Sequence, residues 1–119
     1  MVGDPGSAWA PARGELIWVA FTPHAGHEQG GRRPALVISP RVYNARVGLC
    51  LACPVTHRLK GYPFEVPLPA GGAVQGVILA DQVRTLDWRA RDARSAGSAP
   101  QAVVAGVLAR LLVLLDAPR

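Results

Sequence analysis

The sequence predicts a mainly β fold, namely a small, partly open β-barrel of five to seven short strands with a C-terminal α-helix. Several apolar runs have the length of strands and are separated by glycine, proline and polar residues. Only the last segment carries apolar residues at helical spacing. The length of 119 residues suits a single core. We therefore expect a flexible lead over residues 1–12 and one domain over residues 13–116.

The first half of the chain supplies three of the predicted strands. Each is an apolar run, and Pro34 and Pro40 bound the second of them. A glycine-rich polar loop over residues 22–33 separates the first two runs, and a short loop around Tyr43 and Asn44 leads into the third. The three predicted strands lie within residues 16–21, 35–39 and 47–53.

The second half supplies the remaining predicted strands. Residues 64–68 alternate in polarity, and Pro67 indicates an edge strand because proline cannot donate to a ladder. One or two strands follow within residues 77–86, and residues 92–99 are expected to form a polar connector. The apolar positions of the alternating segment that we expect to face inward are Phe64, Val66 and Leu68.

The final segment has the features of an amphipathic helix. Ser98 is a plausible N-cap, and Pro100 suits the first helical turn. The apolar positions recur every three or four residues and define a broad packing face, formed by Val103, Val104, Val107, Leu108, Leu111, Leu112 and Leu115.

Two cysteines have the C-x-x-C spacing that is also found in redox and zinc sites. Cys50 and Cys53 lie in a predicted strand, where residues three apart point to opposite faces. Zinc needs about four ligands, and only His57 is near in sequence. We therefore expect buried structural thiols, and neither a metal nor another cofactor.

The formal charge of +5 and the sequence pI of about 10.2 indicate a polyanionic partner: nucleic acid, an acidic protein or a membrane surface. Residues 32–60 hold six basic residues and no acidic one. No apolar run is long enough to cross a membrane, and no secretory signal is recognisable. We therefore expect a cytoplasmic protein with no membrane partner.

Two short segments are the best candidates for chemistry. An R-R-P segment at residues 32–34 borders the glycine-rich loop, and a P-V-T-H segment at residues 54–57 follows the third strand. A guanidinium matches phosphate oxygens and stays charged, and a threonine hydroxyl can donate to a further oxygen. Such groups can hold a phosphodiester and stabilise charge in the transition state. Neither a G-x-S-x-G elbow nor a P-loop is present.

Six segments follow one another along the chain without large gaps: GELIWV (14–19), EQGGRRPALVISP (28–40), YN (43–44), CPVT (53–56), KGYPFEV (60–66) and LADQVRTLDWR (79–89). Through these segments the chain resembles the MazF/PemK family of toxin endoribonucleases from about Gly14 to Leu115. The resemblance implies an SH3-like barrel ending in a helix, a homodimer, metal-independent cleavage of single-stranded RNA, and inhibition by a cognate MazE-like antitoxin.

The resemblance also implies roles for individual residues. The catalytic arginine of the family falls on Arg33, its catalytic threonine on Thr56, and the glutamate of the first loop, whose role is less settled, on Glu28. Many relatives carry a small polar residue where this chain has His57, so a part for this histidine in proton transfer stays open. Further RNA contacts are expected from Arg32, His24, Gln29, Arg58, Lys60 and Gln82.

The implied reaction uses the 2′-hydroxyl of the substrate, which attacks the adjacent phosphorus and leaves 2′,3′-cyclic phosphate and 5′-hydroxyl ends. Arg33 would neutralise the phosphorane, and Thr56 would orient it. Because a guanidinium holds its proton, His57 or Glu28 is the better proton acceptor.

We expect structural roles for several other polar and aromatic residues. Asp81 and Gln82 interrupt an apolar segment and, if buried, would need partners and would brace the site from behind. Trp18 and Trp88 are expected in the core or at a dimer interface.

Two other functions compete with RNA cleavage: a gyrase-inhibiting toxin of related fold, and a non-catalytic RNA-binding barrel.

Overall fold

The computed structural model describes residues 9–20 and 31–116. Within these ranges lie seven strands, two α-helices and a 3₁₀ turn, which confirms the mainly β class with a C-terminal helix. In chain order the elements are β1 (Glu15–Ala20), β2 (Arg32–Val37), α1 (Arg41–Val47), β3 (Cys50–Thr56), β4 (Glu65–Pro67), β5 (Val77–Leu79), the 3₁₀ turn η4 (Ala80–Gln82), β6 (Arg84–Leu86), β7 (Arg94–Ser98) and α2 (Gln101–Asp116).

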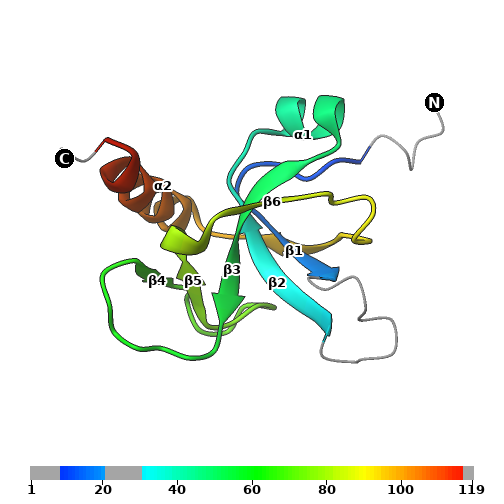
Figure 1. Cartoon of the computed structure of the whole chain (residues 1–119). Coiled ribbons are helices and arrows are strands. Elements are labelled where there is room, and N and C mark those ends of the chain that lie inside the picture. Colours follow the sequence, from blue (N-terminus) through cyan, green and yellow to red (C-terminus); the bar gives the residue numbers. More distant parts are fainter. Residues whose placement is uncertain (1–8, 21–30, 117–119) are drawn as a thin grey trace.

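The strands form one antiparallel sheet that does not close. Their order is β4-β5-β3-β2-β1-β7, and β6 pairs with β3. No pairing in the described part of the chain joins β4 to β7. The outer position of β4 confirms the edge strand that Pro67 predicts. In Figure 1, α2 lies on the side of β4 and β5. The short helix α1 lies near the start of β3, away from the arrowhead that marks the end of that strand.

Two apolar clusters pack on the two faces of the sheet. Cys53 belongs to the cluster that includes Leu36 and, from α2, Val107. Cys50 belongs to the other cluster, which includes Ile17. Both thiols are buried and free. The prediction that these cysteines point to opposite faces, as buried structural thiols, is therefore confirmed.

A helix replaces the loop predicted around Tyr43 and Asn44, because α1 covers this segment. The Asn44 side chain is buried. It donates to the carbonyl oxygens of Pro11 at 2.8 Å and Ser39 at 2.9 Å, and it accepts from the Ser39 hydroxyl at 2.6 Å. The loop prediction was wrong because a helix of seven residues is too short to show apolar periodicity. Satisfied buried hydrogen bonds specify this turn instead.

The segment before the last helix also differs from the prediction. The expected connector over residues 92–99 contains β7, an edge strand whose residues are mostly exposed and which therefore shows no clear apolar alternation. Ser98 ends this strand and is not the N-cap of the helix. The carbonyl oxygen of Pro100 accepts the N–H groups of Val103 at 3.0 Å and Val104 at 3.2 Å in the first turn of α2.

The predicted packing face of α2 is confirmed only as far as Leu111. Val104, Val107 and Leu111 are buried. Beyond them the helix presents an apolar end to solvent, which consists of Leu112, Val113, Leu114 and Leu115. Within residues 9–20 and 31–116, no helix combines the length and apolar character that a bilayer crossing requires.

The N-terminal residues that the structure describes pack on the sheet. The Trp9 ring contacts Trp88 edge-on, with 5.5 Å between the ring centroids, and Ala10 is buried. Residues 1–8 of the predicted lead lie outside the described residues. We propose that the packed unit begins at Trp9, a few residues before the domain start predicted at residue 13.

Candidate active site

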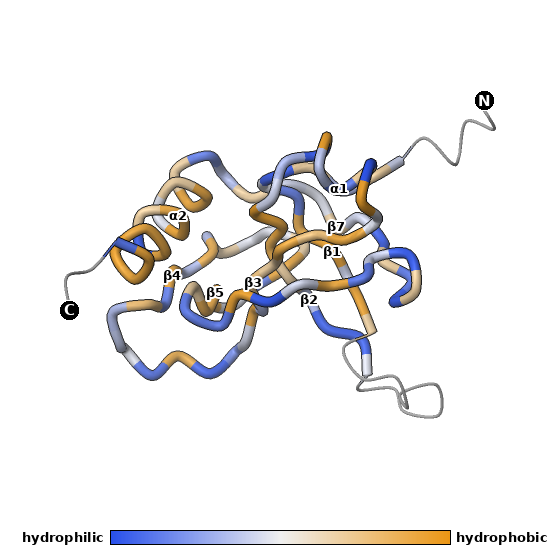
Figure 2. The backbone as a smooth tube through the Cα atoms, turned by 45° about the horizontal axis from the view of Figure 1, so that its top comes forward, coloured by the Kyte–Doolittle hydropathy of each residue, from blue (hydrophilic) through white to orange (hydrophobic). Residues whose placement is uncertain are grey.

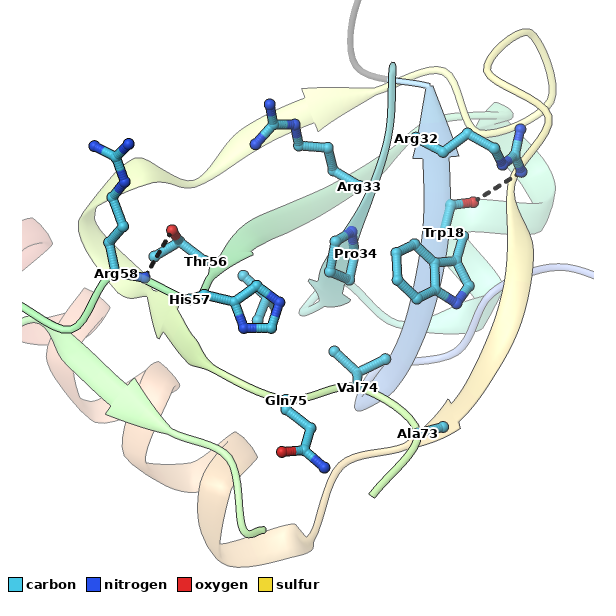
Figure 3. Close-up of a pocket in the computed structure, with 11 residues that line it drawn as sticks. Trp18, Arg32, Arg33, Pro34, Thr56, His57, Arg58, Ala73, Val74 and Gln75 are labelled. Atoms are coloured by element: carbon cyan, nitrogen blue, oxygen red, sulfur yellow. Dashed lines mark hydrogen bonds between the residues drawn. The ribbon is translucent and has the colours of Figure 1, made fainter. Parts of the chain in front are cut away.

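A pocket lies where the exposed start of β2 meets the end of β3 (Figure 3). Its volume of about 480 Å³ falls in the range of ligand sites. The loop between β4 and β5 forms another side. The pocket is lined by Trp18, Arg32, Arg33, Pro34, Val55, Thr56, His57, Arg58, Ala73, Val74 and Gln75.

Strand register brings Arg33 and Thr56 together. β2 and β3 are antiparallel, with Ala35 opposite Pro54, and from this pair β2 runs back to Arg33 while β3 runs on to Thr56, so both residues lie at the same end of the two strands. The burial of β2 changes along its length, because its first two residues are exposed and its last three are buried. The sheet therefore holds the backbone of Arg33 firmly while its guanidinium extends into solvent.

The Thr56 hydroxyl is oriented by the chain that follows it. Its Oγ1 accepts the backbone N–H of Arg58 at 3.2 Å (Figure 3). Because that bond uses an oxygen lone pair, the hydroxyl hydrogen can still donate to a ligand. Pairing of Thr56 with Val77 of β5 holds the strand end in place. Figure 3 shows the Thr56 hydroxyl on the same side of the pocket as the guanidinium groups of Arg33 and Arg58.

His57 and Arg58 follow Thr56 and complete this side of the pocket. Both side chains are exposed, and the His57 ring points into the pocket beside Pro34 (Figure 3). Within the described part of the chain, neither these two side chains nor that of Arg33 makes a hydrogen bond or ion pair with another protein group. Their donors are therefore available for a bound anion.

Arg32, unlike Arg33, is held by the protein. Its Nη2 donates to the carbonyl oxygens of Asp92 at 2.7 Å and Trp18 at 3.5 Å, and its Nη1 lies 3.5 Å from the Asp92 carboxylate. Trp18 itself is 37% exposed and lines the pocket, so it is not a core residue, and its expected alternative place at a dimer interface stays a prediction. Trp88 is buried, as expected of a core residue.

Two predicted RNA contacts lie outside this pocket. The Lys60 side chain is exposed, and its backbone N–H donates to the buried Glu65 carboxylate at 3.0 Å. Gln82 is exposed on η4 and does not line the pocket. The expectation that Asp81 and Gln82 are buried and brace the site is wrong, because the chain leaves the strand at η4 and turns both outward.

The Asp81 carboxylate has a different partner, the hydroxyl of Tyr62, which donates to Oδ1 at 3.1 Å. Partial desolvation and this hydrogen bond raise the pKa of Tyr62. The remaining predicted site residues, His24, Glu28 and Gln29, lie outside the described residues.

The sequence did not indicate the side of the pocket that the β4–β5 loop forms. Val74 is buried there and Gln75 is exposed, and the next residue, Gly76, has a φ of +123°. A Cβ atom on Gly76 would lie 2.3 Å from the Thr56 carbonyl oxygen. The glycines at 71 and 72 indicated a turn, but nothing in the sequence showed that this turn reaches Thr56.

The charge of the pocket defines the class of ligand. Among the residues that the structure describes, three arginines and a histidine line it, and no carboxylate does. The described residues contain no group of three or more His, Cys, Asp or Glu that could hold a metal ion. An open pocket with several cationic donors and one oriented hydroxyl suits a phosphodiester of an extended chain. The fold and site thus define a small β protein of the nucleic-acid-binding class.

Comparison with known proteins narrows this class to one family. The family model described as PemK-like, MazF-like toxin of type II toxin–antitoxin system matches residues 12–115. The endoribonuclease toxin MazF of Escherichia coli (strain K12) is 47% identical over 109 residues, which cover 92% of this chain and 97% of the relative. This chain belongs to the PemK-like, MazF-like toxin family.

Other relatives and solved structures agree. Escherichia coli endoribonuclease PemK is 38% identical over 109 residues, covering 87% of this chain and 80% of the relative. The crystal structure of Deinococcus radiodurans MazF has a TM-score of 0.82 and 58% identity, covering 91% of this chain and 98% of that chain. A MazE–MazF crystal structure from the same organism has a TM-score of 0.82 and 52% identity, covering 91% and 97%.

Proposed function

We propose that this chain is the toxin of a toxin–antitoxin system and an endoribonuclease that cuts single-stranded messenger RNA without a metal. The observation that carries the proposal is that Arg33, near the start of β2, and Thr56, at the end of β3, line one pocket together with other cationic side chains. Its relatives in Escherichia coli, at 47% and 38% identity, are named as endoribonucleases.

The proposed reaction uses the ribose of the substrate as the nucleophile. The 2′-hydroxyl loses its proton as its oxygen attacks the adjacent phosphorus, and the bond to the 5′-oxygen breaks as that oxygen takes up a proton. The products carry 2′,3′-cyclic phosphate and 5′-hydroxyl ends. The guanidinium of Arg33 balances the extra negative charge of the phosphorane, and the Thr56 hydroxyl donates to one of its oxygens. The sheet holds the backbones of both residues in place before the substrate arrives.

Proton transfer is assigned to His57 or Glu28. His57 adjoins Thr56 and points into the pocket, and a neutral imidazole can accept the 2′-hydroxyl proton. Replacement of each residue by glutamine in turn separates the two assignments. The variant that has lost the proton acceptor cuts RNA at least about tenfold more slowly, with RNA binding unchanged.

The test of the proposed function uses labelled single-stranded RNA and protein treated with EDTA. Wild-type protein is expected to cut the RNA and to leave ends that accept a 5′-phosphate without prior dephosphorylation. Arg33→Ala lowers kcat/KM by about 10²-fold or more, because a preorganised donor to the developing charge is lost. Arg41→Ala removes the same charge from exposed α1 and serves as the matched control.

Three outcomes separate the candidate functions. Cleavage that depends on Arg33 supports the nuclease. Binding of RNA without cleavage indicates the non-catalytic barrel, and inhibition of gyrase without any effect on RNA indicates the gyrase-directed toxin. Full activity of Arg33→Ala would remove the assignment of the catalytic arginine.

Two protein partners and a location belong to the same proposal. A MazE-like antitoxin is the first, because solved structures of similar chains are MazE–MazF complexes. Its acidic segment would lie over the pocket, whose lining is rich in arginine. A homodimer would cover the apolar end of α2, because an exposed cluster of large apolar residues favours a protein contact. The cytoplasm, where messenger RNA is found, is the proposed location. Light scattering with and without a Leu112→Lys change tests the dimer contact.

A further inference from the structure

A second, smaller cavity of about 400 Å³ continues the pocket beyond Trp18. It is lined by Trp18, Arg32, Asp92 and Arg94, and it shares the first two of these with the pocket that contains Arg33 and Thr56. We propose that this cavity is a subsite in which an unpaired RNA base next to the cut linkage stacks on the Trp18 indole. The inference rests on the proposed function, because it names a contact of the same substrate.

Trp18 is the aromatic surface of the proposed subsite. Its neighbours along β1, Ile17 and Val19, are fully buried, whereas the Trp18 side chain points to the other face of the sheet and is 37% exposed. The strands on either side place Pro34 and Arg94 directly opposite it. A large exposed indole at the wall of a cationic pocket suits base stacking, by which proteins hold single-stranded nucleic acid without pairing to it.

Asp92 organises the charges around the indole. It has a φ of +52°, the only positive φ of a non-glycine residue in the described chain, and this left-handed conformation turns its carbonyl oxygen toward Arg32. The Asp92 carboxylate lies 3.3 Å from Nη2 of Arg94 and 3.5 Å from Nη1 of Arg32. Two arginines share one carboxylate, so one positive charge stays uncompensated beside the ring.

The geometry divides the substrate between the two cavities. Because alternate residues of a strand point to opposite faces, Arg33 and Thr56 lie on one face at the strand ends, and Trp18 and Pro34 lie on the other. A nucleotide has the same division, since its phosphate and its base extend from opposite sides of the ribose. A phosphate at Arg33 can therefore have its neighbouring base over Trp18, with Arg94 near the next phosphate.

The experiment combines base removal from the RNA with changes at Trp18. A substrate with one cleavable linkage is prepared with an abasic nucleotide at each flanking position in turn. For wild-type protein, one of these abasic positions is expected to lower kcat/KM about ten- to hundredfold, the effect of losing one base–aromatic stack. Trp18→Ala lowers kcat/KM on the intact substrate by a similar factor, and at that position the abasic substitution then has no further effect.

Two further variants keep the result independent of folding. Trp18→Phe keeps an aromatic face and should retain most of the base dependence. Val42→Ala removes an apolar side chain that is 68% exposed on α1, and it should leave kcat/KM and the abasic profile unchanged. The non-additive effect of the protein change and the base removal is a signature that a merely structural role of Trp18 would not produce.

Other outcomes overturn the inference. Active wild-type protein with a flat abasic profile, or Trp18→Ala with the same abasic penalties as wild type, removes the subsite and leaves the proposed nuclease intact. Unchanged cleavage by Trp18→Ala together with weaker binding of an acidic peptide assigns the exposed indole to a protein partner instead. A wild-type protein that cuts no RNA overturns the proposed function itself, and the subsite with it.

Discussion

Gly76 shows how a single residue outside the predicted site controls the geometry at Thr56. Its φ of +123° is strained for any side chain, and an added Cβ would meet the Thr56 carbonyl oxygen at 2.3 Å. We expect Gly76→Ala to displace the end of β3, to lower the free energy of unfolding by about 2–4 kcal/mol, and to reduce RNA cleavage at least about tenfold. Denaturant unfolding and cleavage kinetics measure the two effects.

The matched control for this prediction is Gly71→Ala. Gly71 also has a positive φ, +92°, but an added Cβ would meet no atom within 4 Å. This variant therefore has the backbone strain without the collision, and we expect about 1 kcal/mol of destabilisation with cleavage unchanged. Equal losses of activity in both variants would contradict a specific role of Gly76 in positioning Thr56.

The two cysteines give a prediction for pH. Burial raises the pKa of Cys50 from 9.0 to about 11, and burial together with the Asp81 charge raises that of Cys53 to about 12. At pH 8 the folded protein should thus react with iodoacetamide roughly a hundredfold more slowly than the denatured chain, because the thiolate is the reactive form. Equal alkylation rates for folded and denatured protein would contradict this burial.

The same shifts predict how stability changes in alkali. Above about pH 9 the unfolded thiols lose their protons while the folded thiols keep theirs. The unfolded state then binds fewer protons, so the free energy of unfolding falls as the pH rises from about 9 toward 12. Urea unfolding at pH 7 and pH 10 should show this fall, and it should be smaller in Cys50→Ala/Cys53→Ala.

Residues whose chemistry is local could be predicted from the sequence, and residues whose role depends on packing could not. Arg33, Thr56, His57 and Arg58 were predicted as site residues, and the structure brings them to one pocket. The part of Gln75 depends on where the β4–β5 loop folds back. Trp18 resembles any strand tryptophan in sequence, because its exposure is set by what the sheet leaves uncovered.

At the scale of elements, the segment between β3 and β4 is held by a buried carboxylate. Glu65 accepts the N–H of Gly61 at 2.8 Å through Oε1 and the N–H of Lys60 at 3.0 Å through Oε2. The segment begins with His57 and Arg58, so its shape affects the pocket. Charge-assisted hydrogen bonds to a buried group contribute more to stability than neutral ones on the surface.

We expect Glu65→Ala to lower the free energy of unfolding by about 2–3 kcal/mol and to raise KM for RNA roughly tenfold, because two backbone amides lose their acceptor. The change in kcat should be smaller, since Arg33 and Thr56 stay paired by the sheet. Glu65→Gln keeps one acceptor oxygen, so its free energy of unfolding and its KM should lie between those of wild type and of Glu65→Ala. Asp116→Ala removes an exposed charge at the end of α2 and should change neither quantity.

Strands and helices could be predicted from the sequence where their apolar residues form a recognisable pattern. The first three strands and the final helix were found because they contain apolar runs or a regular apolar period, although the predicted strand ends at 16–21, 35–39 and 47–53 differ by up to three residues from β1, β2 and β3. α1 and β7 were missed because the first is defined by hydrogen bonds of Asn44 and the second is exposed along most of its length. The sheet order depends on contacts between distant segments, which no local pattern records.

For the whole molecule, the net charge of +5 favours RNA, but the arginines at the pocket should determine how binding depends on salt. If Arg33, Arg58 and Arg94 each contact one phosphate, the logarithm of the binding constant should fall with the logarithm of salt concentration with a slope of about −2, at roughly −0.7 per phosphate of a single strand. Fluorescence anisotropy with an uncleavable 2′-deoxy analogue measures this slope.

The location of the charge, and not its total, should decide the slope. Arg58→Ala and Arg41→Ala both lower the net charge by one, yet only Arg58 lines the pocket, and Arg41 lies on α1 at the far end of the sheet. We expect Arg58→Ala to make the slope shallower by about 0.7 and Arg41→Ala to leave it unchanged, because counterions are released only where a cation meets a phosphate. Equal changes in both variants would mean that RNA is held by the diffuse field of the whole protein. Figure 2 shows hydrophilic and hydrophobic segments alternating along the backbone of the described residues. The contrast between these two arginines therefore tests the site by its geometry.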